Sequence, residues 1–228
     1  DTINKVKSIS IWIFIVPFIA INTCLILITN FHDLFPNKEH IIHNTIPYID
    51  GGASISRTAR VFPTYLIFKP AMFLTAYLLI RYWLYIKKII LNIHGEHKNL
   101  KKILIFGIGS AICLVIHSIF LGIKFDYDLY KLFRRVIMLV FIIFEVVAQA
   151  YLVITLYSIK NKLLSFINLK FLKLKAILVS ILVFVMVVSI PIVSMPGNKH
   201  IKHALEWDFF LGVILFYVLT FFMWKKQS

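Results

Sequence analysis

Long runs of apolar residues, each about as long as a membrane-spanning helix, limit most strongly how this chain can fold. No charged residue lies between Ser8 and His32, and similar runs recur along the rest of the chain. About 20 such residues form a helix that crosses roughly 30 Å of hydrocarbon. Hydrophobic residues make up 60% of the sequence, which is more than a soluble domain contains. We therefore predict an all-α integral membrane protein.

Polar or lysine-rich segments separate the apolar runs. The predicted spans are residues 9–29, 65–86, 103–123, 136–159, 176–193 and 207–224. A long polar segment, residues 30–63, connects the first two spans and contains several prolines and the Gly51–Gly52 pair. Proline and glycine interrupt helices and favour turns. The sequence thus predicts a single transmembrane domain, a six-helix transmembrane bundle over residues 1–228.

Lysine and arginine residues are unevenly distributed between the two sides of this predicted bundle. The side that holds the N-terminus, the second and fourth loops and the C-terminus has 15 of the 25 basic residues. Cytoplasmic loops are enriched in such residues, so we predict that both termini are cytoplasmic and that residues 30–63 form an outer loop. A bacterial inner membrane and a eukaryotic internal membrane both satisfy this rule. The net charge of +15 suits contact with anionic lipids, and we predict no nucleic-acid binding.

One acidic residue, Glu145, lies in the middle of the fourth predicted span. A charged residue at that depth costs about 2.5–3.5 kcal/mol on insertion scales. Gln149 follows four residues later and shares the same helical face. Glu145 is interpreted either as a functional group, accepting a proton or contacting a lipid head group, or as a structural one. In the structural interpretation it is protonated or pairs with Lys69, Arg81 or a Ser/Thr donor.

Several histidines occur in the predicted outer segments. The candidate metal ligands are His40, His43, His200 and His203. Histidine and carboxylate ligands bind zinc and leave one position open for water, and the zinc then converts that water into a hydrolytic nucleophile. We favour the alternative that these side chains are solvated loop residues, because the sequence has no HExxH or equivalent motif. No cofactor is firmly predicted.

Two short motifs and the overall plan resemble a known family. Pro47–Gly52 reads PYIDGG and is followed by Ser54–Ser56 just before the second span, and His203–Trp207 reads HALEW at the start of the last span. Together with six spans and a long first outer loop, these segments resemble the DRAM/Sfk (Frag/DRAM/Sfk) superfamily of six-span membrane proteins. The chain departs from the usual pattern at Asp50, where a serine is commoner in that family.

The resemblance implies a protein of lipid handling or lipid-anchor remodelling that recognises a head group at its outer face. It makes the outer loops, with Glu206 and Trp207, the functional face. The candidate residues for that face are Asp50, Arg57, Glu145, Gln149, His203, Glu206 and Trp207. Arg57 is included because a guanidinium group can bind phosphate with two hydrogen bonds.

Two other functions stay open at this stage. The chain is alternatively a non-catalytic subunit of a larger membrane protein complex, or a metal-dependent membrane lipid hydrolase. Its expected partners are membrane lipids or other membrane protein subunits. The sequence leaves open whether the protein is an enzyme.

Overall fold

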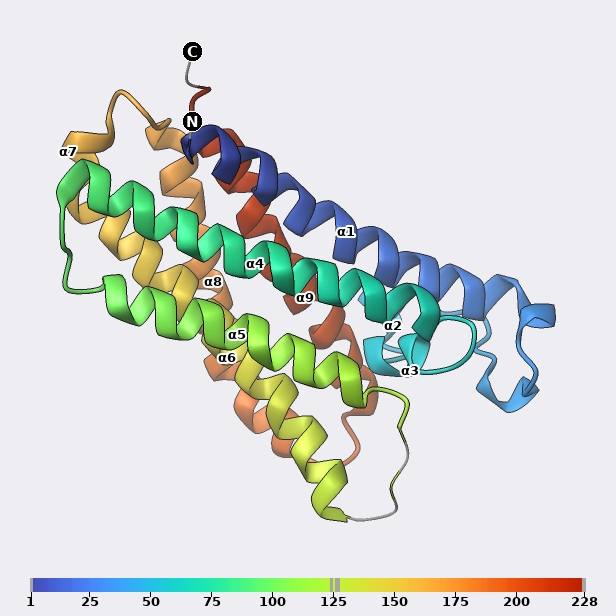
Figure 1. The fold of residues 1–228 in the computed structure, drawn as a ribbon. Helices are drawn as coiled ribbons and strands as arrows, with labels where there is room; N and C mark the ends of the chain where they lie inside the picture. The colour runs from blue at the N-terminus through green and yellow to red at the C-terminus, as the bar shows by residue number, and fades with distance from the viewer. Residues whose placement is uncertain (1, 124, 126–127, 227–228) are drawn as a thin grey trace.

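A computed structural model of the chain describes residues 2–123, 125 and 128–226, and this part is built from helices (Figure 1). The long helices are α1 (Thr2–Asn30), α4 (Tyr65–His94), α5 (Leu100–Phe120), α6 (Asp128–Ser158), α8 (Leu169–Ser194) and α9 (Lys199–Met223). The short ones are η1 (His32–Leu34), η2 (Lys38–His40), α2 (Pro47–Asp50), α3 (Ile55–Ala59) and α7 (Lys160–Leu163). The described residues contain no strand, so the all-α prediction is confirmed.

Five of the described helices are long and apolar enough to cross a membrane: α1, α5, α6, α8 as far as Ile192, and α9. This result agrees with a multi-pass integral membrane protein. The helix α4 is as long as these five but carries Lys69 and Arg81 within its apolar stretch, and it is not among them. The sixth span therefore stays a prediction.

The helices extend beyond several of the predicted spans. The helix α8 begins at Leu169 and includes Lys175, which we had expected in a basic loop. The predicted spans leave residues 194–206 as a polar turn between them. The helix α9 already begins at Lys199, so the prediction of a turn is wrong for residues 199–206. Lysine is a good helix former, and a turn of basic residues can therefore extend an apolar helix instead of ending it.

The long helices are arranged in a closed ring. The helix α1 packs against α4, α4 against α5, and α5 against α6, while α8 lies between α6 and α9, and α9 returns to α1 (Figure 1). The start of α1 and the end of α9 meet where Lys7 Nζ donates a 2.9 Å hydrogen bond to the carbonyl oxygen of Trp224. The two ends of the described chain therefore lie at the same end of the bundle.

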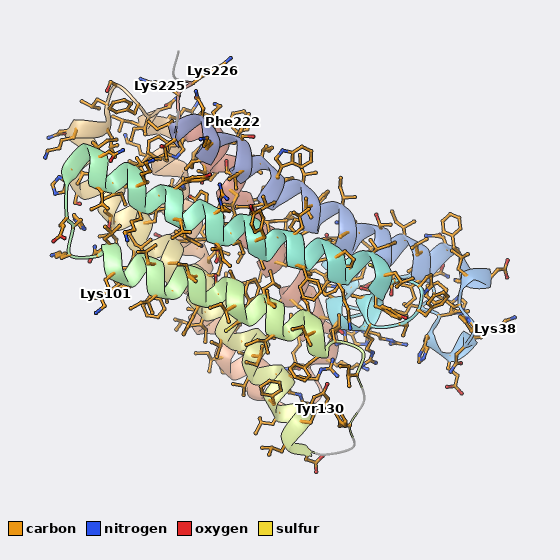
Figure 2. The ribbon with its side chains drawn as sticks, viewed as in Figure 1. Lys38, Lys101, Tyr130, Phe222, Lys225 and Lys226 are labelled. Atoms are coloured by element: carbon orange, nitrogen blue, oxygen red, sulfur yellow. The ribbon has the colours of Figure 1, made fainter. Side chains whose placement is uncertain are left out.

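Polar residues mark the two ends of the ring. Lys101, Lys225 and Lys226 lie at the end where α1 begins, whereas Lys38 and Tyr130 lie at the opposite end (Figure 2). The second end also holds α2 and α3 (Figure 1), and we call it the loop end. Between the two ends, α8 exposes large apolar side chains such as Phe184, which is 67% exposed, as expected for a surface that faces lipid.

The contact between α4 and α5 depends on a close approach at Gly107. A Cβ atom at this position would lie 2.5–2.6 Å from ring atoms of Trp83, a fully buried residue. We expect Gly107→Ala to lower the free energy of unfolding by about 1–3 kcal/mol, because the buried ring cannot move aside. Thermal unfolding in detergent measures this change. Ile105→Ala, at an exposed position of the same helix, should leave the stability nearly unchanged, and equal effects would contradict the assignment.

Candidate functional site

Glu145 is buried inside the ring and is the centre of a hydrogen-bond network. Ser110 Oγ of α5 donates to Glu145 Oε2 at 2.6 Å, and Gln149 Nε2 donates to Glu145 Oε1 at 3.1 Å. The Tyr217 hydroxyl of α9 also donates to Oε1. The sequence suggested a Ser/Thr donor, Lys69 or Arg81 as the partner of Glu145, and the structure shows the serine. Lys69 instead donates to the carbonyl oxygen of Ile119, and Arg81 to two tyrosine hydroxyls of α4. The carboxyl group therefore connects α5, α6 and α9 within the bundle.

A buried lysine continues this network toward α8. Lys175 is fully buried and donates from Nζ to Thr220 Oγ1 at 2.8 Å, and the same nitrogen lies over the Phe216 ring, 3.9 Å from the centroid. The Tyr82 hydroxyl lies 3.5 Å from the same Thr220 oxygen, and the Tyr82 ring packs edge-on against Tyr217. Polar side chains thus link α8 to Glu145 through α9 and α4.

A cavity lies beside Glu145 and opens toward the loop end of the ring. Its cavity volume is about 80 Å³, which is smaller than the roughly 300–1,000 Å³ of common ligand pockets. Residues from α1, α3, α4, α5, α6 and α9 line it, and most of them are apolar. The polar exceptions include Glu145, Tyr217, His117 and Glu206. The cavity can therefore bind an apolar group and offers carboxyl groups from α6 and α9.

The exposure of the lining residues shows where the cavity opens. Lining residues of α1 and α4, such as Ile13 and Met72, are buried. Along α6 and α9, by contrast, several lining residues are only half-buried: Met138, Phe141, Ile142, Phe209 and Phe210. The opening therefore lies between the halves of α6 and α9 that are nearer the loop end.

Glu206 lines the cavity and holds the start of α3. Its carboxyl group accepts hydrogen bonds from the backbone N–H groups of Ile55 and Ser56, while Ser54 caps the same helix by accepting from Arg57 N. The first N–H groups of a helix have no partner within the helix, and Glu206 satisfies two of them. In the described structure, Glu206 therefore joins α9 to the loop that carries α3.

Three further side chains of α9 bind the backbone of the same loop. His200 Nδ1 lies 3.2 Å from the carbonyl oxygen of Asp50, and His203 Nδ1 lies 2.9 Å from that of Gly51. Trp207 Nε1 donates to the carbonyl oxygen of Ala53 at 2.9 Å. These residues lie on one face of α9 because they are spaced three and four apart. Residues 50–56 are thereby fixed along the first turns of the helix.

Asp50 organises the turn that this face binds. Its carboxylate accepts hydrogen bonds from Thr45 Oγ1 at 2.6 Å and from the N–H groups of Gly52 and Ile46, both at 2.8 Å. The bond from Thr45, followed by the two backbone bonds and the nearby charge of His200, lowers the pKa of the Asp50 carboxyl group. Its stabilising effect is therefore present at neutral pH and is lost only as the pH falls through this lowered pKa.

The histidines considered as zinc ligands lie in separate places. His200 and His203 use Nδ1 for the loop backbone, His43 packs edge-on against His32, and His40 lies in η2. Among the described residues, no group of three or more His, Cys, Asp or Glu side chains is arranged to hold a metal ion. These donors do not fit a zinc site, and we derive no chemistry from one.

Of the residues selected from the sequence, Glu145 and Glu206 line the cavity. Gln149 bonds to Glu145, and Trp207 bonds to the loop backbone at Ala53. The buried Lys175 was missed, because the other lysines between residues 160 and 175 made this segment resemble a surface loop. Ser110 and Tyr217 were also missed, since no local pattern sets them apart from other polar residues in apolar helices. Arg57 lies half-buried on α3, next to Ser56 of the cavity lining.

No protein-family model, curated protein or solved structure matches this chain.

The hydrogen bond from Tyr217 to Glu145 provides a test of the buried network. We expect Tyr217→Phe to lower the free energy of unfolding by about 1–3 kcal/mol, because it leaves a buried acceptor with one donor fewer. Thermal unfolding in detergent gives the value. Tyr77→Phe, at a position of α4 that is 55% exposed, is the matched control and should change little. Equal stability of the Tyr217→Phe variant and the wild type would contradict the network.

Attachment of the outer loop to α9 can be followed by proteolysis, because Arg57 and Arg60 are trypsin sites within it. Trp207→Phe removes the Nε1 donor while keeping an aromatic ring beside Tyr48. We expect faster cleavage after these arginines, since the loop backbone then opens more often. Trp12→Phe, at an exposed position of α1, should cleave at the wild-type rate. Unchanged cleavage of the Trp207→Phe variant would show that this bond does not hold the loop.

Proposed function

We propose that this chain is a multi-pass membrane protein that binds a lipid and recognises its head group at the outer face. In this proposal, the apolar part of the lipid occupies the cavity between α6 and α9. The cavity itself, lined mostly by apolar side chains and by two carboxyl groups, is the observation that carries the proposal. A carboxyl group within an apolar pocket gives orientation to an amphiphilic ligand, and Glu145 and Glu206 both line this pocket.

The position of the opening supports a lipid over a water-soluble ligand. The half-buried lining residues belong to α6 and α9, two helices that are apolar enough to span a membrane. In this proposal, a ligand that enters along these apolar helices comes from the bilayer side. An acyl chain can use this route because it does not leave the hydrocarbon region.

The two motifs that resemble the DRAM/Sfk superfamily are in contact with each other. His203 bonds to the backbone at Gly51, and the Trp207 ring packs edge-on against Tyr48 at 4.9 Å. Segments that are far apart in the sequence thus form one structural unit at the loop end. This contact supports the proposal that both motifs belong to a functional face and that lipid handling or lipid-anchor remodelling is the activity.

We also propose the six-span arrangement with both ends in the cytoplasm. The contact between Lys7 and Trp224 places the two ends of the chain together, as an even number of crossings requires. The end of the bundle that holds Lys101, Lys225 and Lys226 (Figure 2) is the basic side on which cytoplasmic loops are expected. Lys69 and Arg81 lie toward the two ends of the predicted second span, and their long side chains can extend to the membrane interfaces.

Photocrosslinking in nanodiscs tests the proposed lipid site. A phospholipid with a diazirine in its acyl chain should label cavity residues such as Ile142 and Phe209, as identified by mass spectrometry. We expect Met138→Trp to reduce this labelling several-fold, because the larger side chain fills the opening between α6 and α9. Leu139→Trp adds the same volume at an exposed position of α6 and should not reduce it.

Labelling confined to outward-facing residues such as Ile143, to the same extent in both variants, would overturn the proposal. This result would show that the lipid contacts the protein only as part of the surrounding bilayer and does not enter the cavity. Gel filtration and thermal unfolding of each variant establish that a loss of labelling is not a loss of fold.

A further inference from the structure

A second cleft lies at the loop end, where the first outer loop meets the connection between α5 and α6. Asn37, His40, Arg60, Gly122 and Arg134 are among the residues that line it. Gly122 has a φ of +85°, and a Cβ atom there would lie 2.9 Å from the carbonyl oxygen of Arg60. This close backbone approach, which suits glycine, positions Arg60 on one side of the cleft and α6 on the other.

The charges that line this cleft are not balanced. The surrounding atoms lower the pKa of the Arg60 guanidinium group even though it keeps contact with solvent, and the positive charges of Arg134 and Arg57 lower it further. Arg134 Nε is buried and has no hydrogen-bond partner. Within the described part of the chain, none of these three arginines forms an ion pair. Positive charges that converge beside a buried donor without a partner are costly, and a bound anion would offset this cost.

The cleft and the lipid cavity meet along α6. Arg134 lines the cleft, and Met138, one helical turn further along, lines the cavity. The charge of Arg134 also acts on His117, a cavity residue whose Nδ1 is buried without a partner. A molecule with an apolar chain in the cavity can therefore place an anionic group beside Arg134.

We infer that this cleft binds a phosphate group, and that Arg60 and Arg134 hold its oxygen atoms. Phosphate suits the site because guanidinium groups bind its oxygens through paired, charge-assisted hydrogen bonds. At the rim, His40 provides a further donor, while Asn37 Nδ2 donates to Glu39 Oε2 at 3.5 Å. The inference rests on the proposed lipid-binding function, since it makes the phosphate the head group of the lipid in the cavity. Arg134, which was not among the residues selected from the sequence, thereby becomes a specificity-determining residue.

Binding of two lipids with identical acyl chains tests this inference. Delipidated protein in a neutral detergent is mixed with phosphatidic acid or with diacylglycerol, and native mass spectrometry gives the bound fraction of each. We expect the wild type to prefer phosphatidic acid by at least about tenfold, the range of one charge-assisted contact. Arg134→Gln and Arg60→Gln should each remove most of this preference. Arg135→Gln removes the same charge from the adjacent exposed position and should keep it.

Competition with inorganic phosphate distinguishes a site for the phosphate of a lipid head group from a site for free phosphate. If the group is a lipid phosphate, we expect millimolar inorganic phosphate to displace phosphatidic acid only weakly. This displacement, like the lipid preference, should be lost in the Arg134→Gln variant. Strong binding of inorganic phosphate by a protein that shows no preference between the two lipids would overturn the head-group assignment. Arg60→Gln provides the same test at an exposed side chain if Arg134→Gln does not fold.

The outcomes separate this inference from the function on which it rests. Equal binding of both lipids, unchanged in either arginine variant but reduced by Met138→Trp, would overturn the phosphate site and leave the lipid cavity standing. Retention of neither lipid, with no effect of Met138→Trp, would overturn the lipid-binding function itself.

Discussion

The arrangement of the bundle depends on how it accommodates one buried acid. A carboxyl group deep among apolar helices must find donors within the protein, because neither lipid nor water supplies them there. Glu145 finds donors on α5, α9 and its own helix. The positions of Ser110 and Tyr217 therefore limit how far these helices can slide or rotate relative to α6. The same contacts fix one wall of the cavity, since Glu145 and Tyr217 both line it.

Polar contacts also fix the rim of the cavity at the loop end, but there they use the backbone. His203, Glu206 and Trp207 each bind main-chain groups of the loop that carries α3. The helices α2 and α3 are too short to be stable alone. The contacts with α9 explain how the loop that carries them holds Ile55 and Ser56 in the cavity wall. Residues that the sequence marked as functional thus have a structural role as well, and a loss of activity in their variants needs a stability control to be interpreted.

The helical class and the long segment between the first two spans were predictable from hydropathy, and the cost of a charge in an apolar run singled out Glu145. The bond between Gln149 and Glu145 follows from a spacing of four residues. The other partners of Glu145 depend on how distant helices pack, which no local pattern contains. Lys175 was misread for a related reason, since only its contacts with Thr220 and Phe216 distinguish it from its solvated neighbours.

One stripe of α6 connects the features that matter for function. Arg134, Met138, Ile142, Glu145 and Gln149 follow one another at helical spacing, and they pass from the cleft through the cavity to the buried network. Their immediate neighbours, such as Arg135, Leu139 and Ile143, are exposed. A helix presents such a stripe as one continuous surface. The positive charge of Arg134, the apolar side chains of Met138 and Ile142, and the carboxyl group of Glu145 therefore follow one another in a fixed order. An amphiphile bound along this stripe has its anionic end at Arg134 and its chain directed toward Glu145, so a single helix determines both its polarity and its depth.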